Sequence, residues 1–334
     1  MTNQAAPHLL AVEDLAVEFD TPQGPQRAVR GVSFEVGECE TLAIVGESGS
    51  GKSVTAQTVM GLIPLRARVA GGRVVLEGRD VVGLSDREWR KLRGERIAMI
   101  FQDPLSALNP SLTVGYQIAE MFRRHRGMGR KDARRRAAEL MDQVGIPDAA
   151  RRLDDHPHRF SGGMRQRVMI AMALALDPLL LIADEPTTAL DVTVQAQILR
   201  LLRERQRTDR LGMILISHDL GVVARAADRV AVMYAGRIVE TGTVAEVYER
   251  PAHPYTLGLM RAVPTSRDGG APLEAIEGQP PSLTDPPTGC SFHPRCPFAR
   301  DVCRESDPEP RVLGPRRASA CHFTEEVIAN ARER

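Results

Sequence analysis

Hydrophobic residues alternate with polar ones or form short runs in the first 50 positions, which predicts strands there, and two further stretches up to residue 101 have the same character. These stretches are separated by polar or Gly-containing turns, as expected between strands. The predicted strands are LAVEF at 15–19, GVSFEV at 31–36, TLAIVG at 41–46, GGRVVLEGRDV at 71–81 and RIAMIF at 96–101.

The pattern changes to a helical period from about residue 113 to residue 176. Ala137, Leu140, Met141 and Val144 form one apolar stripe on an otherwise charged segment. Strand and helix patterns then alternate, which predicts a parallel sheet flanked by helices. The strands of this part are LLLIAD at 179–184, MILIS at 213–217 and VAVMYAG at 230–236.

The composition shifts at Pro251, where prolines become frequent and no long periodic segment follows. Residues 251–290 are therefore interpreted as a linker to a tail that carries four of the five cysteines. The predicted division is a first domain over 1–250 and a Pro-rich, Cys-rich extension over 251–334.

The composition is that of a globular protein, with 334 residues, 43% hydrophobic and 26% charged. A net charge of +1 provides no strong positive potential for binding the phosphates of nucleic acid, so no nucleic-acid partner is expected. The longest apolar run, at 168–176, is far below the ~20 residues that cross a bilayer. The N-terminus does not resemble a secretory signal, and in a cytosolic protein clustered cysteines more often bind metal or do redox chemistry than form disulfides.

A nucleotide triphosphate site is predicted at TLAIVGESGSGKS, where an apolar strand leads through a Gly-rich turn into a helix that begins near Lys52. Gly46, Gly51, Lys52 and Ser53 match the phosphate-binding pattern G-x-x-x-x-G-K-[ST]. Glycines let backbone N–H groups point at phosphate oxygens, and the helix N-terminus adds positive charge. The Lys52 ammonium can reach the β- and γ-phosphates, and the Ser53 hydroxyl can bind Mg²⁺. The competing interpretation is a flexible loop that matches by chance.

Two acids end the strand in LLLIADEP, at positions 184 and 185. At the carboxyl edge of a parallel sheet, Asp184 can hold Mg²⁺ through water, and Glu185 can polarise the attacking water. The competing interpretation is that the two acids cap the next helix.

FSGGMRQR at 160–167 indicates which class of phosphate-loop protein this is. Together with FQDP at 101–104, ADEP at 183–186, TALD at 188–191 and SHD at 217–219, it resembles the nucleotide-binding subunit of an ABC transporter. The resemblance implies an α/β fold: a P-loop ATPase core with a parallel sheet, an N-terminal antiparallel β subdomain, an α-helical subdomain at about 105–176, and a small Cys-rich C-terminal extension.

The resemblance also implies roles for single residues. Ser161, Gly162 and Gly163 contact the γ-phosphate of ATP bound to the other subunit of a head-to-tail dimer. Gln102 contacts Mg²⁺ and water, and His218 contacts the γ-phosphate. The expected catalytic residues are Glu185, His218 and Gln102. The expected nucleotide-binding residues are Phe19, Gly46, Ser48, Gly49, Ser50, Gly51, Lys52, Ser53, Gln102, Ser161, Gly162, Gly163, Asp184 and Asp191.

Three positions need a separate comment on their role in the family. Asp191 corresponds to the aspartate that couples the two ATP sites. Phe19 stands where the family stacks an aromatic on adenine, and its alternative role is a core phenylalanine. Met164 replaces the glutamine that ends the signature in many members, so contacts made by that glutamine are not expected here.

The tail resembles one branch of the family, through RPAHPYTLGLM at 250–260 and EGQPPSLTDPPTGCSFHPRC at 277–296. These stretches are similar to the C-terminal extension of oligopeptide and dipeptide importer ATPases. The branch implies a peripheral protein on the cytoplasmic face of the inner membrane. Its implied partners are two permeases, a second ATPase subunit (a related chain, or a second copy) and, indirectly, an extracytoplasmic binding protein.

Other functions remain open at this level. Nickel or glutathione importers share the branch, and an exporter, a soluble ABC ATPase outside transport and a redox sensor are further alternatives.

Cys290, Cys296, Cys303 and Cys321 offer four thiolates, enough for one tetrahedral metal or one iron–sulfur cluster. The resemblance favours a structural [4Fe–4S] cluster, with zinc or unligated thiols as alternatives. Cys39 is expected to be a small buried residue.

Overall fold

The computed structural model describes residues 8–187, 190–262 and 276–332. The chain divides into two compact units. The first unit comprises residues 1–10, 36–40 and 83–216, and the second comprises residues 11–35, 41–82 and 217–334.

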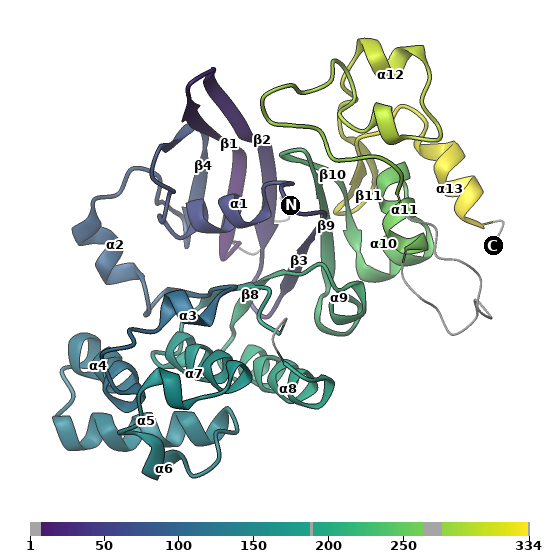
Figure 1. Ribbon diagram of the computed structural model, residues 1–334. Coiled ribbons are helices and arrows are strands. Elements are labelled where there is room, and N and C mark those ends of the chain that lie inside the picture. Colours follow the sequence, from purple (N-terminus) through teal and green to yellow (C-terminus); the bar gives the residue numbers. More distant parts are fainter. Residues whose placement is uncertain (1–7, 188–189, 263–275, 333–334) are drawn as a thin grey trace, which may run out of the picture. The chain divides into compact units, whose positions relative to one another are not determined.

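The first unit contains a group of helices and three parallel strands (Figure 1). Helix α4 packs against α5, and both contact α7. The predicted stripe on α5 is buried, with Ala137 and Met141 fully inaccessible. The helices of this unit are α2 (Asp86–Leu92), α3 (Pro104–Ala107), α4 (Val114–Arg126), α5 (Arg130–Gln143), α6 (Ala149–Arg152), the 3₁₀ turn η1 (Pro157–Arg159), α7 (Gly162–Leu174) and α8 (Val192–Thr208).

The strands of the first unit are β6 (Ile97–Ile100), β7 (Leu180–Asp184) and β8 (Gly212–Ile216). β7 pairs in parallel with β6 on one side and with β8 on the other. Every residue of β7 is buried, which explains why its sequence is a continuous apolar run rather than an alternating one. The strand brings Asp184 to its carboxyl end.

The second unit carries β3 (Thr41–Val45), the strand that precedes the predicted phosphate loop. It pairs in parallel with β9. β9 (Arg229–Tyr234) pairs antiparallel with β10 (Arg237–Thr243), which pairs antiparallel with β12 (Arg317–Ser319). β11 (Arg311–Gly314) closes this arrangement as an antiparallel partner of β12.

A separate four-stranded sheet has the order β2-β1-β4-β5, and its β4–β5 pair is antiparallel. Its strands are β1 (Leu10–Thr21), β2 (Gly24–Val36), β4 (Ala67–Leu76) and β5 (Arg79–Asp80). The helices of the second unit are α1 (Lys52–Val59), α9 (Leu220–Ala226), α10 (Val244–Glu249), α11 (Pro254–Arg261), the 3₁₀ turn η2 (His293–Arg295), α12 (Asp301–Glu305) and α13 (Thr324–Arg332).

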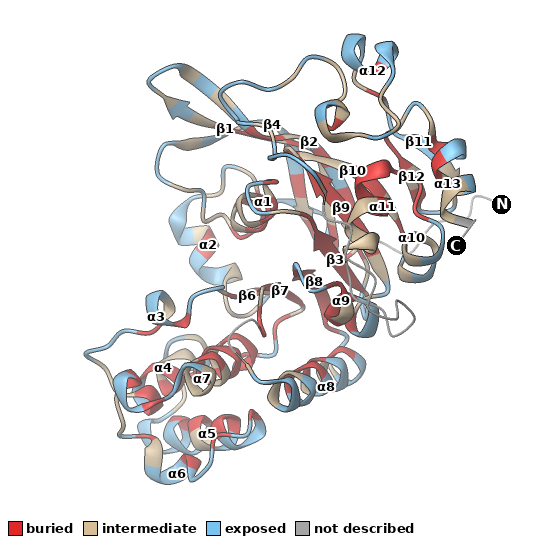
Figure 2. Ribbon diagram, turned by 45° about the vertical axis from the view of Figure 1, so that its right-hand side comes forward, coloured by how far each residue is buried: buried red, intermediate tan, exposed pale blue. Residues whose placement is uncertain are grey.

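One buried cluster joins strand β3 to the C-terminal region, as the red segments of β3, β9 and α11 show in Figure 2. Val45, Val232 and Tyr234 from the strands pack with Tyr255 of α11 and Phe292 of the Cys-bearing segment. Cys290 and Cys296 pack against the same cluster. The C-terminal region therefore shares a core with the strand that leads into the phosphate loop.

The structure corrects two sequence predictions. Residues 251–290 are not wholly a linker, because Pro254–Arg261 forms helix α11 with Tyr255, Thr256 and Leu257 buried; residues 263–275 lie outside the described part. Cys39 is exposed rather than buried, because it occupies a turn with a φ of 56° between β2 and β3.

Within the described ranges, no helix combines the length and the apolar character needed to span a bilayer.

Candidate functional site

The phosphate loop, residues 46–53, has the conformation that its glycines were predicted to permit. Gly46 has a φ of 152°, and a Cβ there would collide with the backbone carbonyl of Met233. Gly51 has a φ of 102°, and a Cβ there would lie 2.8 Å from the Ala28 carbonyl oxygen. Both positions exclude side chains, first by backbone conformation and then by neighbouring carbonyls.

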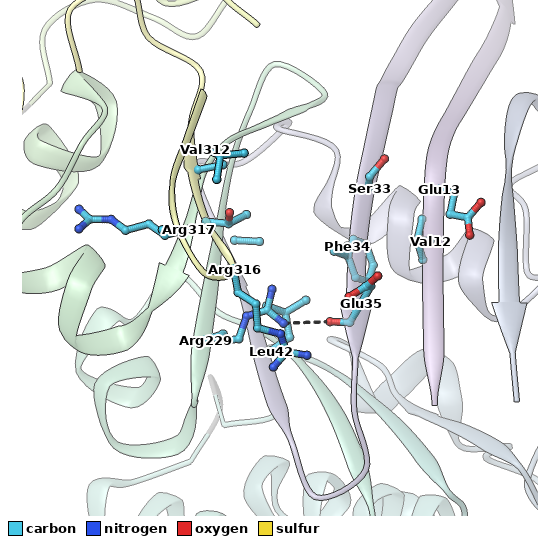
Figure 3. Close-up of a pocket in the computed structure, with 14 residues that line it drawn as sticks. Val12, Glu13, Ser33, Phe34, Glu35, Leu42, Arg229, Val312, Arg316 and Arg317 are labelled. Atoms are coloured by element: carbon cyan, nitrogen blue, oxygen red, sulfur yellow. Dashed lines mark hydrogen bonds between the residues drawn. The ribbon is translucent and has the colours of Figure 1, made fainter. Parts of the chain in front are cut away.

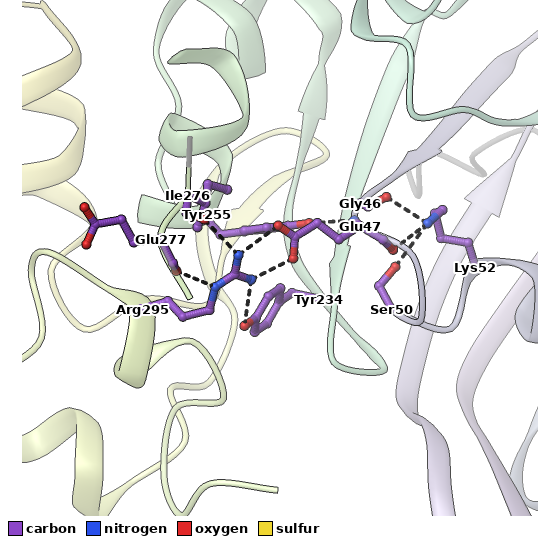
Figure 4. A network of polar contacts seen from close by, with 9 residues as sticks. All are labelled: Gly46, Glu47, Ser50, Lys52, Tyr234, Tyr255, Ile276, Glu277 and Arg295. Atoms are coloured by element: carbon purple, nitrogen blue, oxygen red, sulfur yellow. Dashed lines mark hydrogen bonds and ion pairs between the residues drawn. The ribbon is translucent and has the colours of Figure 1, made fainter. Parts of the chain in front are cut away.

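Lys52 is the first residue of helix α1, and its ammonium is folded onto the loop (Figure 4). Its Nζ donates to the carbonyl oxygens of Gly46 and Glu47, both at 2.8 Å, and to Ser50 Oγ at 3.3 Å. The residue is only 7% exposed. The lysine charge is thus held inside the curve of the loop, where a phosphate group can exchange for the carbonyl acceptors.

The other loop residues differ in exposure. Ser48 and Gly49 are exposed, Ser50 is buried, and Ser53 is half-buried in the first turn of α1. Phe19 of β1 is also half-buried, so it does not belong to the fully buried core.

Gln102 and Glu185 are brought together, as the motif roles require. Gln102 Nε2 donates to Glu185 Oε2 at 2.9 Å. Glu185 has a φ of 49°, a conformation that costs energy for a residue other than glycine, and its N–H donates to the Ile216 carbonyl at 3.0 Å. The strand end therefore turns sharply just after the buried Asp184 and directs the next carboxylate toward Gln102.

Asp184 and Glu185 are not helix caps, so the competing interpretation of these two acids is wrong. The N-cap of the next helix, α8, is Asp191, whose Oδ1 accepts from the Val194 N–H at 3.0 Å. Asp191 itself is exposed. The first two residues of the TALD motif, 188 and 189, lie outside the described residues.

The FSGGMRQR signature begins helix α7. Ser161 is the N-cap and accepts from the Met164 N–H at 3.3 Å, while Gly162 and Gly163 form the first turn. Ser161 and Gly162 are exposed. An exposed hydroxyl beside the N–H groups of a 13-residue helix can bind an anion.

The predicted residues divide between the two units. Gln102, Ser161, Gly162, Gly163, Asp184, Glu185 and Asp191 belong to the first unit. The phosphate loop, Phe19 and His218 belong to the second unit, and His218 is exposed beside Asp219, the N-cap of α9.

Sequence reasoning missed two residues that hold the phosphate loop. The Tyr255 hydroxyl accepts from the Glu47 N–H at 2.7 Å, and Arg295 forms an ion pair with the Glu47 carboxylate (Figure 4). These contacts join residues more than two hundred positions apart, so no local pattern signals them. Gln166, inside the signature helix, was also missed; its Nε2 donates to the Pro186 carbonyl at 2.9 Å.

The four clustered cysteines lie in the C-terminal region, and none of the described cysteines forms a disulfide. Burial raises the pKa of Cys296 to about 12 and that of Cys321 to about 11, and the charge of the neighbouring thiols adds to both shifts. The Cys290 N–H donates to the Cys303 carbonyl oxygen at 2.8 Å, so these two cysteines are neighbours along the backbone. Among the residues that the structure describes, however, no group of three or more His, Cys, Asp or Glu side chains is arranged to hold a metal ion. The expected [4Fe–4S] cluster therefore has no support from the structure.

A further hollow of about 330 Å³ lies in the second unit, lined by strands of both its sheets and by the β11–β12 region (Figure 3). Arg229 crosses it and donates to the Glu35 carbonyl at 3.3 Å. None of the predicted ATP-site residues lines it.

Comparisons with known proteins identify the family of the chain. The ABC transporter family matches residues 29–188, and the family "Oligopeptide/dipeptide transporter, C-terminal region" matches residues 239–303. A dimeric ATP-binding cassette in a post-hydrolysis state, bound to ADP and Pi, is 27% identical, with a TM-score of 0.65, over 70% of this chain and 98% of that one. Fold and site together define an ABC-type ATPase cassette.

Relatives that match along most of this chain indicate the branch of the ABC ATPase family to which it belongs. The dipeptide transport ATP-binding protein DppD of Bacillus subtilis is 52% identical over 97% of both chains. The DppD of Escherichia coli is 49% identical over 94% of this chain and 96% of its own, and the oligopeptide transport protein OppD of Bacillus subtilis is 54% identical over 90% and 84%. The chain belongs to the family of ATP-binding subunits of dipeptide and oligopeptide ABC transporters. Subunits of this kind are ATPases coupled to transport, and the nickel, glutathione and non-transport alternatives are not favoured.

Proposed function

We propose that this chain hydrolyses ATP to drive the uptake of dipeptides or short oligopeptides through separate permease subunits. The observation that carries the proposal is the phosphate loop, with Lys52 held inside it, in a chain 52% identical to a dipeptide transport ATP-binding protein along nearly its whole length.

The ATP site is proposed to consist of the residues that the sequence motifs predict. Phe19 stacks on adenine, and the loop residues Gly46, Ser48, Gly49, Ser50, Gly51 and Lys52 surround the phosphates. Ser53, Gln102 and Asp184 would hold Mg²⁺, for which hydroxyl, amide and carboxylate oxygens are suitable ligands. When bound, the ion neutralises charge on the phosphate oxygens.

Hydrolysis is assigned to Glu185, with Gln102 and His218 as the other catalytic residues. The water oxygen forms a bond to the γ-phosphorus, while the bond to the β,γ-bridging oxygen breaks and its electron pair leaves with ADP. Glu185 accepts the proton of the water. The Gln102 amide donates to the Glu185 carboxylate at 2.9 Å and so fixes the position of that carboxylate. His218 contacts the γ-phosphate.

Transport requires a second ATPase subunit in this proposal. Ser161, Gly162 and Gly163 contact the γ-phosphate of ATP held by the partner's loop, and Asp191 couples the two sites. ATP drives closure because it binds the closed pair more tightly than the open pair. A related chain is the expected partner, with a second copy as the alternative. The pair lies on the cytoplasmic face of the inner membrane beneath two permeases, which a substrate-binding protein supplies.

The functional division of the chain is proposed to be a nucleotide-binding domain over 1–250, with its helical part at about 105–176, and a C-terminal extension over 251–334. The proposal of a metal centre in the extension rests on the resemblance of the segment that bears Cys290, Cys296 and Cys321 to importer ATPases. No group of described side chains is arranged to hold a metal ion. The ligands would be these three thiols and Cys303, and a [4Fe–4S] cluster is proposed ahead of zinc.

The proposal is tested with the chain assembled with its permeases and binding protein in proteoliposomes. We expect dipeptides to stimulate ATP hydrolysis and to accumulate inside, and Lys52→Ala to abolish both. Stimulation by nickel or glutathione and not by peptides would refute the peptide assignment. Hydrolysis that survives Lys52→Ala would refute the site.

A further inference from the structure

Arg295 connects the Cys-bearing segment to the phosphate loop. It ends the η2 turn, between Cys290 and Cys296 in the sequence, and its guanidinium points toward Glu47 (Figure 4). Nη1 lies 2.7 Å from Glu47 Oε2, and Nη2 lies 3.0 Å from Oε1. The Arg295 side chain is 5% exposed and that of Glu47 is 26% exposed. This two-pronged pairing is the strongest geometry available to an arginine and a carboxylate.

The remaining donors of Arg295 are also occupied. Nε donates to the Glu277 carbonyl at 2.9 Å, Nη2 to the Ile276 carbonyl at 3.3 Å, and Nη1 to the Tyr234 hydroxyl at 3.4 Å. A guanidinium has five N–H groups, and each of them has an acceptor here. The orientation of the guanidinium is therefore fixed independently of Glu47, so it can hold the loop rather than follow it.

Glu47 is held at its backbone as well. Its N–H donates to the Tyr255 hydroxyl at 2.7 Å, and its carbonyl oxygen accepts from Lys52 Nζ at 2.8 Å. Tyr255 is fully buried against Tyr234 and Phe292, with ring centroids 4.6 and 5.4 Å away. Two residues of the C-terminal region thus hold the loop residue that follows Gly46.

We propose that Arg295 is a positioning residue for ATP: by pairing with Glu47 it keeps the first half of the phosphate loop in the shape that receives the phosphates. The inference rests on the proposed ATP site and deepens it, because it makes the C-terminal extension a working part of that site. Without the pair, ATP has to order the loop as it binds. Ordering one or two residues lowers affinity roughly tenfold or more.

The test measures ATP binding and steady-state hydrolysis on the full chain with three variants. Arg295→Gln removes the ion pair with Glu47. Arg295→Lys keeps the positive charge but cannot form the two parallel hydrogen bonds that the guanidinium makes with the carboxylate. Tyr255→Phe removes the independent hold on the Glu47 backbone. We expect each to raise the KM for ATP, Arg295→Gln by about tenfold or more. The kcat at saturating ATP should stay within about twofold, because Glu185 and Gln102 are untouched.

Asp307→Asn is the matched control. Asp307 accepts from Arg30 and Arg237, so its loss weakens another anchor of the same extension without touching Glu47. We expect this variant to keep the wild-type KM. An equal rise in KM with Asp307→Asn would show that any loosening of the extension suffices and would overturn the positioning role.

Two further outcomes also decide the matter. Wild-type ATP affinity in Arg295→Lys would overturn the proposal, whether or not Arg295→Gln folds. Failure of the ATP site itself is distinguished by Lys52→Ala, which must abolish binding if that site is correct, whatever Arg295 does.

Discussion

Glu240 gives the folded chain a dependence on pH that a single substitution should remove. The residue lies on β10, is 1% exposed, and accepts from the N–H groups of Ala252 at 2.8 Å and His253 at 3.0 Å. Burial disfavours the carboxylate and is the main cause that raises the Glu240 pKa from 4.5 to about 7. Hydrogen bonds from Thr256 and the two backbone donors, and the charge of Arg317, oppose this rise.

The shift in the Glu240 pKa determines how the free energy of unfolding changes with pH. Because the folded-state pKa lies above the unfolded value, the stabilising contribution is complete below pH 4.5 and is lost as pH rises through about 7. A difference of about 2.5 pH units, at about 1.4 kcal/mol per unit, corresponds to a total loss of about 3.5 kcal/mol, of which about 3 kcal/mol falls between pH 4.5 and pH 7.5.

His253, beside it, has the opposite dependence. Its complete burial lowers its pKa from 6.5 to about 3, so its contribution is present above pH 6.5 and is lost as pH falls toward 3. The two effects cancel between pH 4.5 and 6.5, which hides Glu240 in the wild-type protein alone.

The assay therefore compares urea unfolding of the wild type and Glu240→Gln at pH 4.5 and pH 7.5. The free energy of unfolding of the wild type minus that of the variant should fall by about 3 kcal/mol between these pH values. Background titration, including that of His253, is common to both proteins. A difference that is constant, or that grows with pH, would refute this account of Glu240.

Three other predictions follow from the site. Glu185→Gln keeps an acceptor for Gln102 but loses the base, so hydrolysis should slow by ~10²-fold or more while ATP binding persists; normal turnover would remove Glu185 from that role. Gly46→Ala drives a methyl into the Met233 carbonyl, which should destabilise the fold by ~1–3 kcal/mol and weaken ATP binding, as read by calorimetry; unchanged binding would contradict the loop geometry. Protein purified without oxygen should be brown, with iron and sulfide near four per chain; a colourless preparation with about one zinc per chain would disprove the cluster.

Local sequence patterns predicted the phosphate loop well because each of its requirements is local. A backbone that must adopt the conformations at Gly46 and Gly51 needs glycine, and the helix that starts at Lys52 follows at once. The turn at Glu185 shows the limit of this reasoning, because its φ of 49° is imposed by the surrounding strands and not by its residue type.

The support around the loop could not be predicted. Nothing near Glu47 marks it as the partner of Arg295, 248 residues later, and Pro-rich composition concealed the helix that carries Tyr255. Both depend on tertiary packing, which overrides local propensity. The cysteines were recognised as a group, but their spacing alone does not fix how the thiols are oriented in the fold.

The central claim is that the ATP site of one subunit is completed by Ser161, Gly162 and Gly163 of the other subunit. It is tested most directly in the assembled transporter, with this chain carrying Lys52→Ala and with an ATP analogue that is photoreactive at the γ-phosphate. Since the altered loop cannot hold nucleotide, we predict labelling within residues 160–167 of this chain by ATP bound to the partner. Labelling of that segment only in chains that keep Lys52 would contradict the account.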